Sequence, residues 1–267
     1  MRATPATPPP AEPAFDLDYS IHDFEVKTHR DSQFYIRRVE EVMVEEGGCP
    51  GGRTLDVACG VGQLAARLHE RGVEGWGLEP SREMLGLSRW LYQPDQVILV
   101  RGIAEALPFR DGSFDRVLCQ GSLDHFVHPG AFMREAARVV KPDGRVIIAL
   151  ANYGSLSCRL GRARYRLTRA LLRRPPSAAR PYWQPPPDHY HWGDLPFVRS
   201  LGEGCLRLER CSGVSLLWPM YGWGAWLDRL PRAFAEGLLT VLDRIACRVP
   251  ALADMIVSVW RPLARQG

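Results

Sequence analysis

The sequence predicts an α/β protein built on a doubly wound parallel sheet. Three observations support this fold. Short apolar strand segments alternate with amphipathic helical segments over about 100 residues. A glycine turn follows the first strand and leads directly into a helix, and later polar signals stand at the ends of the predicted strands. Ligands of such folds bind at the carboxyl ends of the strands.

The first strand, turn and helix lie within residues 53–64. Residues 54–58 have the apolar, β-branched character of a buried strand, and Gly60 and Gly62 allow a turn whose backbone approaches a ligand closely. Residues 63–69 carry apolar side chains at helical spacing, so the positive end of this helix faces the ligand. The junction therefore predicts a site for a nucleotide-like cofactor.

The other elements of this region follow in order. A helix at residues 32–46 suits either a lid over the cofactor or a packing helix on the sheet. Ser81 and Pro129 are placed to begin two further helices. Strands are predicted at residues 74–79, 97–102, 114–120 and 145–150. The strand at residues 74–79 ends on Glu79, which Pro80 follows.

Composition changes after Asn152. Residues 145–186 contain no acid, and prolines cluster at residues 175–187, which favours a loop or lid. The arginines of this segment indicate a solvated helix face, or a contact with an anionic acceptor, a carrier protein or an acidic membrane surface. Asp194 is placed to cap a helix through Leu201, strands are predicted at residues 206–214 and 255–260, and the Trp-rich residues 218–249 between them are expected to be helical.

Charge and cysteine spacing exclude several classes of protein. The net charge of +4 does not favour a nucleic-acid partner. The seven cysteines show no zinc-site spacing, so no metal is predicted. Without a secretion signal or an apolar run of membrane-spanning length, the protein is expected to be soluble and cytoplasmic.

Two cofactors compete for the glycine turn. Residues 60–65 fit the dinucleotide fingerprint, with Glu79 at a suitable distance for a ribose contact, so an NAD-dependent oxidoreductase is one interpretation. Asp56 favours S-adenosylmethionine instead. A carboxylate beside the turn suits the ammonium of that cofactor, whereas it would repel a pyrophosphate.

At these motifs the chain resembles the class I S-adenosylmethionine-dependent methyltransferases, particularly the bacterial small-molecule (type 11-like) domain, over about residues 30–152. Residues 56–62 match the first motif of the family, with Ala58 in place of its first glycine. Residues 102–109 are similar to the segment along the adenine, with Ile103 in place of an aspartate. Residues 114–117, 123–126 and 138–144 complete the pattern.

The resemblance implies a Rossmann-like sheet of seven strands, the last of them antiparallel, with helices on both faces. It also implies a helical, Trp-rich insert that covers the substrate. The cofactor is S-adenosyl-L-methionine, and the positions implied to contact it are Asp56, Ala58, Gly60, Gly62, Glu79, Pro80, Ile103, Ala104 and Gln120. Beyond Asn152 the similarity continues at residues 189–192, the following helix and the final strand.

His125 is the candidate catalytic base, because it follows the fourth strand near the expected methyl position. A packing role for His125 is the alternative, and His189 and His191 are second candidates. The aromatic side chains after residue 150 could form an apolar acceptor pocket or a core, and they include Trp183, Trp192, Trp218, Trp223 and Trp226.

These observations divide the chain into four parts. They are a Pro/Ala-rich disordered tail (residues 1–14), an N-terminal lid or packing helix (15–52), the cofactor-binding core (53–152) and a C-terminal part with the Arg/Pro-rich loop, the substrate cap and the last two strands (153–267). Residues 120–123 lack the signature of base-amine methylation, so methyl transfer to oxygen or carbon of a small apolar or aromatic molecule is expected. A non-catalytic cofactor-binding module is the remaining alternative.

Overall fold

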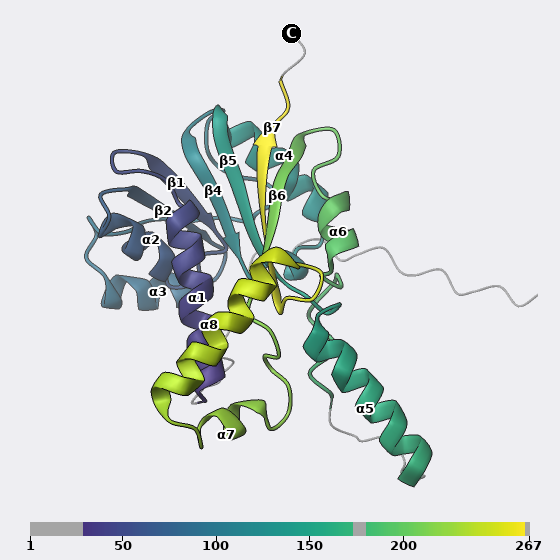
Figure 1. Ribbon diagram of the computed structural model, residues 1–267. Coiled ribbons are helices and arrows are strands. Elements are labelled where there is room, and N and C mark those ends of the chain that lie inside the picture. Colours follow the sequence, from purple (N-terminus) through teal and green to yellow (C-terminus); the bar gives the residue numbers. More distant parts are fainter. Residues whose placement is uncertain (1–28, 173–179, 265–267) are drawn as a thin grey trace, which may run out of the picture.

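The computed structural model describes residues 29–172 and 180–264, in which seven strands form one sheet with helices on both faces (Figure 1). The strand order is β3-β2-β1-β4-β5-β7-β6. Strands β1 to β5 pair in parallel, and β7 runs antiparallel between β5 and β6. This arrangement confirms the predicted doubly wound, Rossmann-like sheet with an antiparallel last strand.

The strands agree closely with the apolar segments of the sequence. They are β1 (Arg53–Val57), β2 (Glu74–Glu79), β3 (Ile98–Arg101), β4 (Phe114–Gln120), β5 (Val140–Ala151), β6 (Leu206–Val214) and β7 (Met255–Pro262). Strand β5 begins earlier than the predicted residue 145. Val140 already pairs with Phe114, and the register then shifts so that Arg145 pairs with Arg116. The polar residues 141–144 are thus an irregularity within the strand, although their composition is typical of a turn.

The helices cover both faces of the sheet. They are α1 (Arg30–Glu46), α2 (Gln63–His69), α3 (Arg82–Leu91), α4 (Pro129–Val139), α5 (Leu156–Leu172), α6 (Leu195–Ser200), α7 (Trp223–Leu227) and α8 (Arg232–Arg248), with a 3₁₀ turn η2 (Leu123–His125). Helices α1 and α2 bury Met43 and Leu68 against one face of the sheet. Helices α4 and α6 bury Phe132 and Val198 against the other.

The predicted helix caps are present. Ser81 Oγ accepts a hydrogen bond from Met84 N at 3.3 Å, and Asp194 Oδ1 accepts one from Phe197 N at 2.8 Å. Pro129 is the first residue of α4, where its missing N–H leaves no hydrogen bond unmade. Each cap fixes where a loop from the sheet turns into a helix.

The C-terminal part contains helices that composition only partly indicates. Helix α5 carries five of the nine arginines of residues 145–186, in keeping with the helix face that the sequence indicates for them. Helices α7 and α8 fill much of residues 218–249, and the Trp218 ring stacks on Tyr35 of α1 at 3.9 Å between ring centroids. The predicted tail at residues 1–14 and the prolines at 175 and 176 lie outside the described residues.

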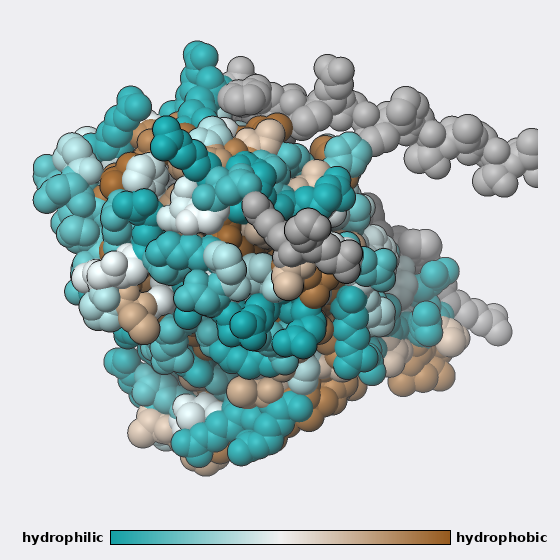
Figure 2. All heavy atoms as spheres, turned by 90° about the horizontal axis from the view of Figure 1, so that it is seen from above, coloured by the Kyte–Doolittle hydropathy of each residue, from teal (hydrophilic) through white to brown (hydrophobic). Residues whose placement is uncertain are grey.

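The two ends of the sheet differ. The parallel strands end at the lower edge in Figure 1, and α5 and α7 extend from that edge. Figure 2 shows the opposite end, whose surface is largely hydrophilic. In the part of the chain that the structure describes, no helix combines the length and the apolar character needed to cross a membrane.

Candidate active site

A cavity of about 550 Å³ lies at the carboxyl ends of β1, β2 and β4. The predicted site residues in its lining are Asp56, Ala58, Gly60, Glu79, Pro80, Ile103, Ala104, Gln120 and His125. Of the nine predicted cofactor contacts, Gly62 alone lies outside the lining, because it stands at the start of α2. The fold therefore brings together residues that are widely separated in the sequence, as expected where parallel strands end at one edge.

The turn after β1 requires left-handed backbone at three positions. The φ angles are 57° at Ala58, 55° at Gly60 and 81° at Gly62. A Cβ added at Gly60 would meet no atom within 4 Å, so this position faces open space, whereas one at Gly62 would lie 3.0 Å from Val97. Gly60 thus lets the backbone approach a ligand, and Gly62 lets the helix pack closely on the sheet.

Glu79 ends β2 with both carboxylate oxygens held by backbone amides. Oε2 accepts a hydrogen bond from Gly60 N and Oε1 accepts one from Ser81 N, each at 2.9 Å. Burial raises the pKa of Glu79 above its ordinary value, and the two amides partly oppose this rise. The amides also fix the orientation of the carboxylate at the cavity wall.

Asp56 is the second buried acid of the site, with only 3% of its surface exposed. Burial, with a smaller contribution from the negative charge of Glu79, raises the pKa of Asp56 to about 8. A positive charge in the cavity would favour the ionised form of this carboxyl group. The site is thus matched electrostatically to a cationic ligand group.

Gln120 and the segment after β3 complete the wall. Gln120 Oε1 is buried without a hydrogen-bond partner among the described residues, which leaves an acceptor for a ligand donor. Ile103 and Ala104 contribute an apolar surface on the other side. Helix α1 adds Ile36 and Glu40, and Glu40 Oε1 accepts a hydrogen bond from Gln63 Nε2 at 2.9 Å.

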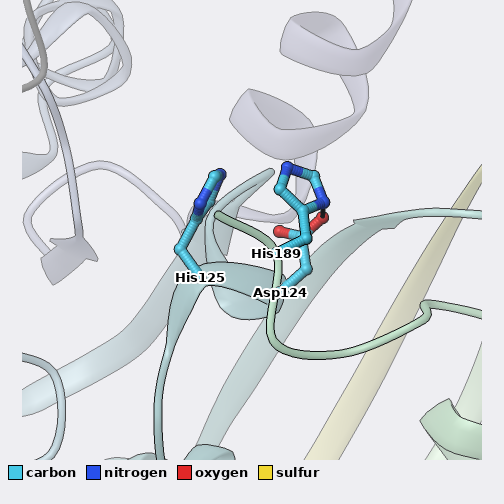
Figure 3. Close-up of side chains that lie close together, drawn as sticks. All are labelled: Asp124, His125 and His189. Atoms are coloured by element: carbon cyan, nitrogen blue, oxygen red, sulfur yellow. Dashed lines mark ion pairs between the residues drawn. The ribbon is translucent and has the colours of Figure 1, made fainter. Parts of the chain in front are cut away.

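Two Asp-His dipeptides form crossed pairs beside the cavity. His125 Nδ1 lies 3.3 Å from Asp188 Oδ2, and His189 Nδ1 lies 2.8 Å from Asp124 Oδ2. Figure 3 shows the two imidazole rings side by side, with the Asp124 carboxylate turned toward His189. The pairs join η2 to the loop before α6 and hold Tyr190 in the cavity lining.

The environment of this cluster is partly buried. Burial lowers the pKa of the His125 imidazole, so its neutral form predominates at neutral pH. Asp124 is almost fully buried, and its Oδ1 has no hydrogen-bond partner among the described residues. Ligand-type atoms of Asp124, His125 and His189 lie within 4.8 Å of one another, and these residue types also bind divalent metals.

The other aromatic candidates lie elsewhere. The cavity lining among the described residues includes none of Trp183, Trp192, Trp218, Trp223 and Trp226. Trp223 and Trp226 stack on each other, while Trp218 packs on α1. His191 stacks on Phe197 with 5.4 Å between ring centroids and is also absent from the lining. Trp192 and Trp226 are largely exposed, so the five tryptophans form neither the wall of this cavity nor a single core.

Comparison with known proteins identifies the fold and its cofactor. Residues 55–148 match a family model described as a methyltransferase domain. The chain is 34% identical over 121 residues to a ubiquinone biosynthesis O-methyltransferase of Sodalis glossinidius, covering 43% of this chain and 47% of that protein. Residues 55–148 are a methyltransferase domain of the class I S-adenosylmethionine-dependent type.

A second curated relative is also named as a methyltransferase. The chain is 33% identical over 141 residues to a demethylmenaquinone methyltransferase of Renibacterium salmoninarum, covering 52% of this chain and 59% of that protein. The chain thus spans about half the length of the curated relatives it matches.

Solved structures extend the likeness of the methyltransferase fold over most of the chain. The YcgJ protein of Bacillus subtilis has a TM-score of 0.53 at 20% identity and covers 86% of this chain and 100% of its own. A SAM-dependent methyltransferase of Aquifex aeolicus has a TM-score of 0.52 at 14% identity and covers 85% and 89% of the two chains. At these identities the likeness concerns the fold.

Several residues that line the cavity are not among the sites that the sequence predicts. Ile36, Glu40 and Tyr190 reach it from segments far from the glycine turn. The sequence allows α1 to act as a lid, but helical spacing alone does not indicate which end of the helix meets a cavity. The repeated Asp-His dipeptide, at residues 124–125 and 188–189, is the one sequence signal that could have indicated the crossed pairs.

Proposed function

We propose that this protein transfers a methyl group from S-adenosylmethionine to oxygen or carbon of a small apolar or aromatic molecule. One observation carries the proposal: the cavity joins the acids and glycine turn of the cofactor motif to His125 and to an apolar wall. The open space at Gly60 and the unpartnered Gln120 Oε1 fit a polar ligand lying against the turn. When bound, the cofactor supplies an electrophilic methyl group on a sulfonium.

The residues of the cavity have distinct roles in holding that cofactor. Glu79 accepts hydrogen bonds from the ribose hydroxyls, while the amides of Gly60 and Ser81 keep its carboxylate in place. Asp56 balances the ammonium group, either directly or through water. Gln120 lies beside the methionine portion, and Pro80 lies next to the ribose.

Ile103 and Ala104 hold the adenine by apolar packing and backbone contacts. Ile103 provides no carboxylate for the adenine amino group. The shape of the apolar wall therefore contributes more to cofactor affinity than a specific polar contact at that position. Ala58 and Gly60 contribute backbone atoms to the wall that faces the cofactor. Gly62 does not line the cavity, and it affects cofactor binding by fixing where α2 begins.

His125 is proposed to take the proton from an acceptor hydroxyl. Its ring lies in the cavity lining, and burial keeps the imidazole neutral and able to accept a proton at neutral pH. Asp188 Oδ2 lies 3.3 Å from Nδ1 and orients the ring. Orientation of the acceptor for in-line displacement supplies much of the acceleration, since good alignment can contribute roughly 7 to 11 kcal/mol.

The acceptor class follows from the apolar residues of the lining. Ile36, Phe126, Val127 and Tyr190 give this part of the cavity an apolar and aromatic surface. Two of the relatives are named as a ubiquinone biosynthesis O-methyltransferase and a demethylmenaquinone methyltransferase. These names support an aromatic hydroxyl or ring carbon as the methyl acceptor here.

The test combines binding and turnover. Calorimetry should show binding of S-adenosylmethionine and no binding of NAD(H), which separates the methyltransferase from the dinucleotide alternative. Labelled methyl transfer is then measured on a panel of catechols, hydroquinones and unrelated small hydroxyl compounds. Cofactor binding without transfer to any acceptor, including a cell extract, would favour a non-catalytic binding module.

A further inference from the structure

Helix α5 differs from the other helices in its charge. It contains five arginines and no acidic residue; the arginines are Arg159, Arg162, Arg164, Arg166 and Arg169. Among the described residues none of these five forms an ion pair with a carboxylate. Arg159 and Arg162 donate hydrogen bonds to backbone oxygens, and Arg164 and Arg169 lie over tyrosine rings. None of these contacts neutralises the positive charge, and a concentration of such charge attracts an anionic surface.

The same helix exposes a row of leucines. Leu160, Leu167 and Leu171 are 44%, 60% and 72% exposed. Their spacing places them on one side of the helix, and the exposed Ala163 and Ala170 continue that side. The row extends over about 16 Å at a rise of about 1.5 Å per residue.

The protein body covers a different side of α5. Gly161 lies against Trp183 and Tyr182, and Tyr165 packs on the Trp183 ring at 5.7 Å between centroids. With about 100° between successive residues, Arg159 and Arg166 border the leucine row on one side, and Arg164 borders it on the other. The exposed part of α5 is therefore an apolar stripe with cations on both sides.

We propose that α5 binds the surface of an anionic lipid bilayer. The leucine row would lie at the boundary between acyl chains and headgroups, and the arginines would contact headgroup phosphates. An acidic carrier protein would need the positive charge but not three exposed leucines bordered by arginine. The lipid surface accounts for both features of the helix.

The position of α5 relates membrane binding to the cavity. It projects from the carboxyl edge of the sheet, the edge at which the cavity lies (Figure 1). The opposite end of the molecule is largely hydrophilic (Figure 2). Binding through α5 would bring the cavity edge close to the bilayer, so the acceptor is a lipid-soluble molecule; this last step rests on the proposed function.

Vesicle sedimentation of the full chain tests the proposal. The protein should bind phosphatidylcholine vesicles that contain phosphatidylglycerol, bind pure phosphatidylcholine vesicles far more weakly, and dissociate as salt is raised. Leu167→Glu should weaken binding about tenfold or more, because it places a charge in the apolar row. Arg166→Ser should weaken it less and reduce its dependence on salt.

The matched control is Val241→Glu, which alters an exposed apolar residue (51% exposed) on α8, a helix with acidic and basic residues. It should leave vesicle binding unchanged. Thermal melting and calorimetry with S-adenosylmethionine should show that all three variants remain folded and bind the cofactor normally. Vesicle binding requires no turnover. The binding result can therefore be interpreted even if no methyl transfer is detected, so failure of this proposal and failure of the proposed function are distinguishable.

Three outcomes would overturn the proposal. They are no binding to either type of vesicle, equal loss in Leu167→Glu and Val241→Glu, and binding to an acidic carrier protein that Leu167→Glu leaves intact. The last outcome would assign the arginines to a protein partner. Faster methylation of a lipid-soluble acceptor in anionic vesicles, lost in Leu167→Glu but not in Val241→Glu, would support the orientation of the cavity edge toward the bilayer.

Discussion

Glu79 at the end of β2 accepts a hydrogen bond from the backbone N–H of Gly60 in the turn after β1, at 2.9 Å. This bond joins the ends of two neighbouring strands at the cavity wall. The same carboxylate accepts a second bond from Ser81, whose hydroxyl oxygen accepts a hydrogen bond from Met84 N at the start of α3. One acid thus fixes the glycine turn and the following helix start while its remaining lone pairs face the cavity.

Replacement of Glu79 by alanine should weaken binding of S-adenosylmethionine about tenfold or more, because hydrogen bonds to a charged group contribute roughly 1.5 to 3 kcal/mol. Isothermal titration calorimetry measures the change. The control is Glu83→Ala, which removes an exposed acid from the first turn of α3. Equal affinity of the Glu79 variant and the original protein would exclude the proposed ribose contact.

The buried Asp56 carboxyl should make the stability of the cofactor-free protein depend on pH. Its pKa of about 8 in the fold exceeds the value of about 3.9 in an unfolded chain. Between these values the folded state holds a proton that the unfolded state lacks, so stability falls as pH rises. Melting temperatures from pH 5 to pH 8 should decline less steeply in Asp56→Asn than in the original protein.

Cofactor binding should reverse the protonation of Asp56. An ammonium group near this carboxyl favours its ionised form, so binding at pH 7 should release a proton. Calorimetry in buffers of different ionisation enthalpy detects the release as a change in apparent binding enthalpy. The Asp56→Asn variant should show no such dependence; a dependence that persists in this variant would assign the proton to another group.

Ala58 has a left-handed backbone, with φ at 57°, where the family motif has glycine. An alanine in this conformation costs about 1 to 2 kcal/mol, whereas the added flexibility of glycine in the unfolded chain costs about 0.4 to 1 kcal/mol. Ala58→Gly should therefore leave the free energy of unfolding unchanged or raise it by about 1 kcal/mol. Urea denaturation tests this, with Ala66→Gly inside α2 as a control that should lose about 0.5 to 1 kcal/mol.

Much of the sheet could be predicted because its strands are continuous apolar segments bounded by turns. Strands β2, β4 and β6 begin and end at the predicted residues. The predicted acids and the glycine turn lie together because the carboxyl ends of parallel strands share one edge. The local sequence pattern and the general topology of parallel sheets are therefore sufficient to predict the cofactor side of the site.

The acceptor side of the cavity could not be predicted in the same way, because it is formed by contacts between segments that are far apart in the sequence. Tyr190 and His189 reach the site from a proline-rich loop, and the Asp124 to His189 pair spans elements with no shared periodicity. The tryptophans could not be assigned from composition, because a core and a pocket use the same side chains. Trp218, for example, stacks on Tyr35 instead of lining the cavity.

Removal of the His125 imidazole should lower turnover with hydroxyl acceptors. His125→Ala should retain the cofactor affinity but reduce kcat by about 100-fold or more, the usual range for a general base. The loss should be much smaller with an acceptor whose hydroxyl is already ionised at the assay pH. His128→Ala, in an exposed histidine three residues away, is the control; equal losses for ionised and neutral acceptors would assign His125 to packing.

Chelation separates proton transfer by His125 from metal binding at the same cluster. The ligand-type atoms of Asp124, His125 and His189 lie within 4.8 Å of one another, yet both imidazoles already pair with carboxylates. In-line displacement from a sulfonium depends on orientation and needs no Lewis acid. We therefore expect methyl transfer to persist after treatment with EDTA. Activity that falls on chelation and returns with Zn²⁺ or Mg²⁺, but not in His189→Ala, would instead make the cluster a metal site and His125 one of its ligands.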